Sequence, residues 1–165
     1  QIGFDKLEQL TAFLMAVPGI PCIYYGDEIG LPGANDPDNR RMMQFENWNE
    51  SQSELHQHTK KLIQFRKENM ALMYGEFIPL QQDNEALVFM RRYLDQTVIC
   101  AFGKQGTVVN VNLQNYVFGN AVKRNPIPFN ANVNPDLVDM VGSGSHKDFV
   151  QLYIGPKGYT FVSMK

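Results

Sequence analysis

The chain has 165 residues, of which 44% are hydrophobic and 19% are charged, and its formal net charge at pH 7 is -2. This composition is typical of a globular protein and excludes a disordered or fibrous one. The charge balance leaves no basic stripe to neutralise phosphates, so nucleic acid is not an expected partner. The longest apolar run is far shorter than the roughly 18 residues of a membrane-spanning helix, so no membrane segment is expected.

The first elements predicted are a helix and a buried strand. Apolar residues recur at three- and four-residue spacing over residues 4–17, which predicts a helix that ends at a Pro-Gly pair. Residues 20–25 are then apolar at consecutive positions, which favours a strand covered on both faces, as in a parallel sheet packed by helices. On this interpretation Cys22 is buried in that strand, and Cys100 is a second, separate buried thiol.

A long loop and a second helix follow. The loop spans residues 26–50, and a loop of this length in a compact domain is usually functional or disordered. Its aromatic and charged residues favour a functional role. Ser51 and Glu54 have the spacing of a capping box, which predicts that the second helix begins there.

From about residue 77 the hydrophobic period changes to two, which is typical of strands. Five such runs follow with no helix between them, so we predict an antiparallel β-sandwich. Residues 125–145 are rich in Asn, Pro and Gly and are expected to form a long connection. The predicted strands cover residues 86–90, 97–102, 107–111, 148–154 and 159–163.

Several motifs carry a resemblance to a known family. The sequence GIPCIYYGDEIG at residues 19–30, followed by NDPDNR at 35–40, resembles the eighth barrel strand and following loop of the α-amylase family of glycoside hydrolases. It is most similar to the neopullulanase, cyclomaltodextrinase and maltogenic amylase subgroup. Residues 62–69 and 74–77 are similar to the last barrel helix and its exit, whereas the second half of the chain matches only in pattern.

The resemblance implies a fragment in two parts. Residues 1–76 would be the last helix-strand-helix portion of a TIM barrel, which is an α/β barrel, and residues 77–165 an all-β antiparallel sandwich domain. A complete barrel needs about 250 residues, and in this family the catalytic carboxylates lie on earlier strands. The implied parent is a retaining α-glucan hydrolase acting on starch-derived oligosaccharides, cyclodextrins or pullulan. The resemblance places no catalytic residue in this chain, so the fragment alone is expected to be inactive.

Asp36 and Arg40 are the candidate substrate-binding residues. Four positions apart in the loop, they offer acceptor and donor groups to vicinal sugar hydroxyls, which a planar guanidinium fits well. In enzymes that this loop resembles, the matching residues contact glucose units on the non-reducing side of the cleavage point. An ion pair that only shapes the loop fits the sequence equally well. Asp38, Asn39 and Arg41 are interpreted as loop scaffolding.

Asp27 and Glu28 invite comparison with the two carboxylates that glycoside hydrolysis requires. Adjacent residues leaving an extended strand point in opposite directions, so we expect them to have a structural role at the barrel rim instead. Phe45 and Trp48 could stack on a sugar, but packing of the loop is favoured. The look-alikes usually carry a proline after the arginine pair, and this chain has Met42 there.

His56 and His58 lie two positions apart on the predicted helix and therefore do not face one another, so we expect surface histidines. No Cys/His ligand spacing, nucleophile elbow or phosphate-binding loop is present, and neither a metal nor a cofactor is expected. Asn49 begins an Asn-Glu-Ser glycosylation pattern, but this pattern is short and common.

Two other functions stay open. The β-region could be a non-catalytic carbohydrate-binding or structural module, which requires exposed aromatics on one sheet face. Alternatively, the parent enzyme transfers α-glucosyl units to an acceptor sugar. The expected partner of the parent enzyme is an α-glucan oligosaccharide. We also expect the fragment to associate with the rest of the barrel or with itself, because the strand at 20–25 would lack neighbours. The aromatics available for a platform are Tyr93, Tyr116, Tyr153 and Tyr159.

Overall fold

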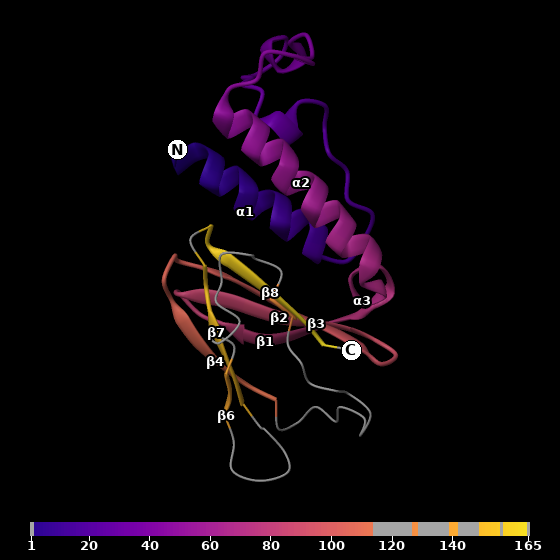
Figure 1. Ribbon diagram of the computed structural model, residues 1–165, viewed down its shortest axis with the longest axis vertical. Helices are drawn as coiled ribbons and strands as arrows, with labels where there is room; N and C mark the ends of the chain where they lie inside the picture. The colour runs from indigo at the N-terminus through magenta and orange to yellow at the C-terminus, as the bar shows by residue number, and fades with distance from the viewer. Residues whose placement is uncertain (1, 114–126, 129–138, 142–148, 156, 165) are drawn as a thin grey trace.

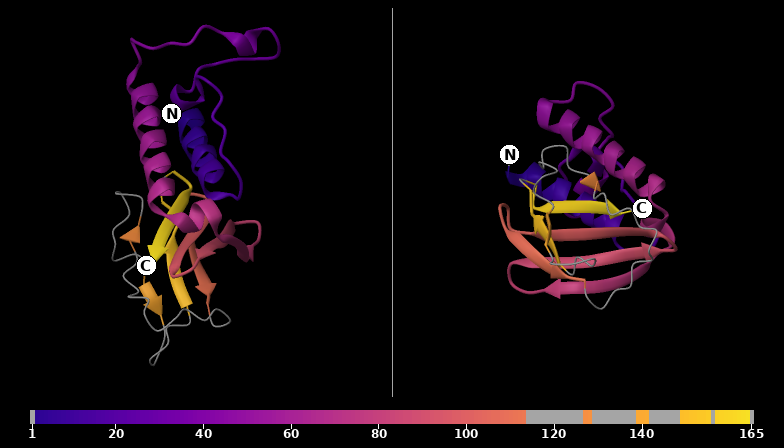
Figure 2. Two further views of the ribbon diagram at one scale, coloured as in Figure 1. Left: turned by 90° about the vertical axis from the view of Figure 1, so that its right-hand side faces the viewer. Right: turned by 60° about the horizontal axis from the view of Figure 1, so that its bottom comes forward.

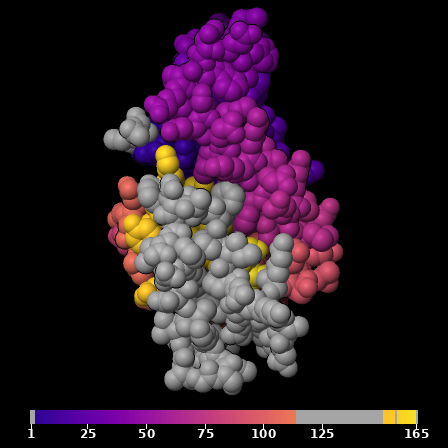
Figure 3. Space-filling view, in the orientation of Figure 1, coloured from indigo at the N-terminus to yellow at the C-terminus, as the bar shows by residue number. Residues whose placement is uncertain are grey.

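The computed structural model describes residues 2–113, 127–128, 139–141, 149–155 and 157–164. Helices lie at one end of the molecule and a β-sandwich at the other, and the loop between the two long helices stands at the end furthest from the sandwich (Figure 1; Figure 3). The helical elements are α1 (Ile2–Ala16), α2 (Glu50–Glu68) and α3 (Met70–Tyr74), and the 3-10 turns in the loop are η1 (Asp27–Ile29) and η2 (Asp38–Arg40).

The strands form two sheets in which every described pairing is antiparallel, so the predicted sandwich is confirmed. One sheet has the order β1-β2-β3-β8-β5 and the other the order β4-β7-β6. Both β5 and β6 fall within the predicted connection 125–145, the rest of which lies outside the described residues. The strands are β1 (Glu76–Gln82), β2 (Ala86–Tyr93), β3 (Gln96–Gly103), β4 (Val108–Asn112), β5 (Ile127–Pro128), β6 (Asp139–Val141), β7 (Phe149–Tyr153) and β8 (Tyr159–Met164).

The larger sheet is the middle layer of three. Its outer face carries the helices, and its inner face meets the smaller sheet (Figure 2). Alternate side chains of the central strands therefore enter two different cores: Val88 packs between the sheets, whereas Phe89 packs under the helices. This double burial explains why the sequence of β2 and β3 is apolar at consecutive positions although the strands are antiparallel.

Residues 20–25 do not form a strand, contrary to the prediction. They make no strand pairing with any described residue, and Ile20 is 97% exposed. A continuous apolar run becomes a buried strand only where neighbouring strands exist to pair with it. Cys22 is consequently exposed, which corrects the expectation that it is buried, whereas Cys100 is fully buried as predicted.

The second helix begins earlier than predicted. Asn49 is its N-cap, because the Asn49 side chain accepts from the backbone N–H of Gln52 and the Gln52 side chain accepts from that of Asn49. The reciprocal geometry is that of a capping box, but its residues are Asn49 and Gln52 rather than Ser51 and Glu54. Asparagine and serine are comparable N-caps, so the sequence offered two starts and the structure uses the earlier one.

Candidate functional site

The loop between α1 and α2 is anchored to the helix pair by η1. Ile29 is fully buried, and glycines with positive φ stand on both sides of the turn, at Gly26 and Gly30. A Cβ on Gly30 would lie 2.8 Å from the Phe4 ring, so the close approach of this turn to α1 requires glycine. Beyond η1 the loop projects away from both helices (Figure 2).

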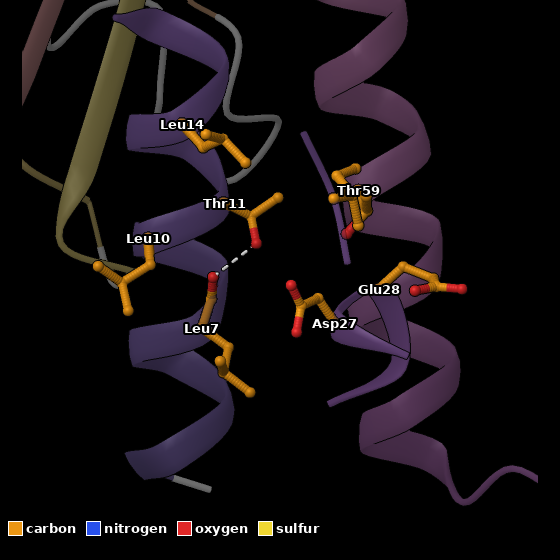
Figure 4. Close-up of a pocket in the computed structure, with 8 residues that line it drawn as sticks. Leu7, Leu10, Thr11, Leu14, Asp27, Glu28 and Thr59 are labelled. Atoms are coloured by element: carbon orange, nitrogen blue, oxygen red, sulfur yellow. Dashed lines mark hydrogen bonds between the residues drawn. The ribbon is translucent and has the colours of Figure 1, made fainter. Parts of the chain in front are cut away.

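Asp27 and Glu28 turn back onto their own backbone. The Tyr24 N–H donates to Asp27 Oδ2 at 3.2 Å, and the Gly26 N–H donates to Glu28 Oε2 at 2.8 Å. These contacts agree with the structural role expected for both carboxylates. Figure 4 shows Asp27 facing the space between the two helices. The two carboxylates border a largely apolar recess of about 200 Å³, also lined by Leu7, Leu10, Thr11, Leu14, Ile23 and Thr59.

Asp36 and Arg40 are brought together at the projecting end of the loop. Arg40 Nη2 lies 2.7 Å from Asp36 Oδ1, and the two side chains are 69% and 62% exposed, respectively. A guanidinium has five N–H donors and a carboxylate has two acceptor oxygens, so this contact does not exhaust either group. Hence both an acceptor and further donors are presented to solvent from the same exposed turn.

Asp38 and Arg41 form a second, two-pronged ion pair next to the first. Arg41 Nε and Nη2 donate to the two Asp38 carboxylate oxygens at 2.7 and 2.9 Å. These hydrogen bonds lower the pKa of Asp38 and raise that of Arg41. The Tyr25 hydroxyl donates to the Arg41 carbonyl at 3.1 Å and ties this turn to the segment that leads into the loop. The arrangement supports the scaffolding role expected for Asp38 and Arg41.

The two loop aromatics differ in their surroundings. Trp48 donates from Nε1 to the Gln44 carbonyl at 2.8 Å and packs edge-on against the His56 ring, with the ring centroids 4.6 Å apart. Trp48 thus has the packing role favoured for it. For Phe45 the favoured packing role is wrong, because this residue is 77% exposed; Met42 is 90% exposed, and both apolar side chains project to solvent.

His58 is not a surface histidine, which corrects the expectation for this residue. Its Nε2 lies 2.6 Å from the hydroxyl of Tyr159 on β8. Burial lowers the pKa of His58 to about 4, and the positive charges of Lys157 and Lys61 contribute in the same direction. Among the described residues, no cluster of three or more His, Cys, Asp or Glu side chains could hold a metal ion.

A polar junction between α1 and the turn before β8 escaped prediction because its partners are far apart in sequence. Lys157 Nζ lies 2.9 Å from Asp5 Oδ1 and 3.3 Å from Glu8 Oε2. Gln9 Nε2 donates to the carbonyls of Gly158 and Gly103, at 2.7 and 3.2 Å. Burial raises the pKa of Glu8, against the opposing effect of Lys157.

The proposed aromatic platform is not assembled by the described residues. Tyr159 is fully buried beneath the helices, and Tyr93 packs against Tyr74 with ring centroids 5.8 Å apart. Tyr153 is partly buried, and Tyr116 lies outside the described residues. As for membranes, none of the described helices has the length and apolar character needed to cross one.

Known proteins resemble this chain over part of their length. The intracellular maltogenic amylase of Bacillus subtilis is 44% identical over 107 residues, which is 63% of this chain and 18% of that protein. A cyclomaltodextrinase of Geobacillus thermopakistaniensis is 35% identical over 108 residues, 64% of this chain and again 18% of that protein. The chain thus spans less than a fifth of the length of these relatives. No profile of a known protein family matches the chain.

The fold agrees with these matches. The α-amylase of Geobacillus thermoleovorans, solved in complex with acarbose, superposes with a TM-score of 0.75 at 25% identity, covering 98% of this chain and 33% of that one. The sequence relatives and the solved structure point to the same group of enzymes. They confirm what the motifs at residues 19–40 predicted: this chain resembles a C-terminal portion of an α-amylase-family enzyme of the maltogenic amylase and cyclomaltodextrinase type.

Proposed function

We propose that the chain is the C-terminal part of a retaining α-glucan hydrolase and that Asp36 and Arg40 contact the sugar. The observation that carries the proposal is the exposed Asp36–Arg40 pair, which lies in the motif that resembles the family's substrate loop. Carboxylate acceptors and guanidinium donors suit vicinal sugar hydroxyls, and an exposed pair can exchange its partner for a ligand. Starch-derived oligosaccharides, cyclodextrins or pullulan are the proposed substrates.

In this proposal residues 1–76 supply the last helix-strand-helix of a catalytic barrel, and residues 77–165 supply a supporting sandwich. Residues 20–25 form no strand pair with any described residue and expose Ile20 and Tyr24. They and the apolar recess beside them support this assignment, because adjoining barrel strands would cover both. The groups that perform a retaining mechanism, a nucleophilic carboxylate and a carboxylic acid that protonates the leaving oxygen, would come from the preceding strands. This chain contributes substrate positioning.

The test uses a fusion in which this chain replaces the matched portion of the Bacillus subtilis relative. We expect the fusion to release reducing sugar from cyclodextrin, and Arg40→Met and Asp36→Asn to raise KM with little effect on Tm. The matched control is Lys104→Met, which breaks an ion pair of similar exposure with Glu85 on the sandwich. Equal effects of Arg40→Met and Lys104→Met on KM would refute the sugar contact. Longer oligosaccharides as the main products would favour a glucosyl transferase instead.

A further inference from the structure

The carboxyl end of α1 is buried, yet it has no basic residue of its own to satisfy its carbonyls. Met15 is 2% exposed and Ala16 is fully buried, and the last turn of the helix contains no Lys, Arg or His. The last four carbonyls of a helix lack partners within the helix, and leaving such groups unpaired in a dry site is unfavourable. Donors must therefore come from elsewhere in the fold.

Two arginines from other elements supply them. From α2, Arg66 donates to the carbonyls of Met15 and Gly19, the latter at 2.6 Å, with a longer contact of 3.4 Å to Val17. From β2 of the sandwich, Arg91 donates through Nη1 to the Ala16 carbonyl at 2.6 Å. Arg91 also reaches the start of β1, donating to the carbonyls of Gly75 at 2.9 Å and Glu76 at 3.3 Å.

Both guanidiniums are buried cations held by carbonyl dipoles. Arg66 is 7% exposed and Arg91 is 1% exposed, and neither pairs with a carboxylate in the part of the chain that the structure describes. Burial lowers the pKa of each. The negative end of the α1 dipole and the forked carbonyl contacts offset the loss of water around these charges. An apolar side chain at either position would leave several carbonyls without donors.

We propose that Arg66 and Arg91 are positioning residues that fix the direction in which the chain leaves α1 toward the substrate loop. The segment they hold, residues 15–19, leads directly into residues 20–25, which form no strand pair with any residue that the structure describes. Beyond it, Ile23 packs partly buried against the core under the helices, and Ile29 is buried in η1. Because Arg91 belongs to the sandwich, this inference gives the sandwich a part in placing Asp36 and Arg40, and to that extent it rests on the proposed function.

The two cysteines allow a direct test on the 165-residue chain. Cys22 is exposed in residues 20–25, directly after the segment that the arginines hold, whereas Cys100 is fully buried. A nitroxide reagent therefore modifies Cys22 selectively. A second label, on α2 through Lys60→Cys, gives a distance distribution between the segment and the helix. We expect Arg66→Met and Arg91→Met to broaden that distribution. The matched controls Lys67→Met and Arg92→Met alter the neighbouring, more exposed cations and should leave it unchanged.

Where a methionine variant does not fold, the lysine variants Arg66→Lys and Arg91→Lys decide, because they keep the charge but lose the forked contacts. The inference would be overturned by a folded methionine or lysine variant whose label-to-label distance distribution is as narrow as that of the labelled protein with both arginines intact. In the fusion, Arg91→Lys should raise KM for cyclodextrin more than it lowers kcat. A broadened distribution with unchanged KM would leave the positioning role intact and refute the sugar contact of the loop.

Discussion

His58 differs from His56 because it faces the sandwich. Its contact with Tyr159 joins α2 to β8, and burial at this site disfavours the charged imidazolium. The folded pKa of about 4 lies below the ordinary value of 6.5, so protonation favours the unfolded chain. The stabilisation from neutral His58 is therefore complete above pH 6.5 and is lost as the pH falls from 6.5 toward 4.

We predict that the unfolding free energy falls between pH 7.5 and pH 5 by about 1–2 kcal/mol more than in His58→Gln, since a glutamine does not titrate. Urea denaturation at the two pH values measures this difference. The comparison with the variant is necessary because Glu8, whose pKa is raised, contributes with the opposite sign. Identical pH dependence in His58→Gln would contradict the prediction.

At the scale of elements, the start of α2 separates two residues that the sequence presents as equivalent. Asn49 forms the reciprocal cap with Gln52, whereas Ser51 lies within the first turn. We predict that Asn49→Ala lowers the unfolding free energy by about 1 kcal/mol, and that Ser51→Ala changes it by only a few tenths. Thermal or urea unfolding followed by circular dichroism measures both. A larger effect of Ser51→Ala would restore the cap first expected from the sequence.

The two long helices and the strands β2, β3, β4, β7 and β8 could be predicted because their sequence patterns are local. The stripe of α1 and the apolar runs of β2 and β3 depend on periodicity alone. The sequence pattern does not predict strand β1, because this strand contains Pro79 and its pairing shifts register between Pro79 and Gln81. An edge strand tolerates both features. Residues 20–25 have the pattern of a buried strand, but a strand forms only where neighbouring strands are present to pair with it, and local sequence does not show this.

The candidate site was predictable to a similar extent. Asp36 and Arg40 lie four positions apart in the loop, and the structure joins them in an ion pair. Such a pair is one of the two roles that the sequence allowed, the other being contact with a sugar. The roles of Arg66 and Arg91 were not predictable, because the carbonyls that they bind at the end of α1 are far away along the chain. The separation is 47 to 51 positions for Arg66 and 75 positions for Arg91. Backbone acceptors leave no trace in side-chain spacing, so only the fold reveals such contacts.

For the whole molecule, the open segment at residues 20–25 should make the isolated chain associate with itself. Ile20 is 97% exposed and Tyr24 is 51% exposed, and the backbone between them has no ladder partner among the described residues. We predict concentration-dependent dimers or larger species in sedimentation velocity, weakened by Ile20→Lys. The matched control is Leu94→Lys, which charges a residue that is 82% exposed in the β2–β3 turn. A monomer at high concentration would count against this expectation.

The chain as a whole is proposed to position substrate while the catalytic carboxylates lie elsewhere in the enzyme. The most direct test is the release of reducing sugar from cyclodextrin, measured in parallel for the 165-residue chain and for its fusion with the remainder of the Bacillus subtilis maltogenic amylase. We predict release by the fusion and none above the blank by the chain alone. Release by the chain alone, or a cooperatively folded fusion that releases none, would contradict the account.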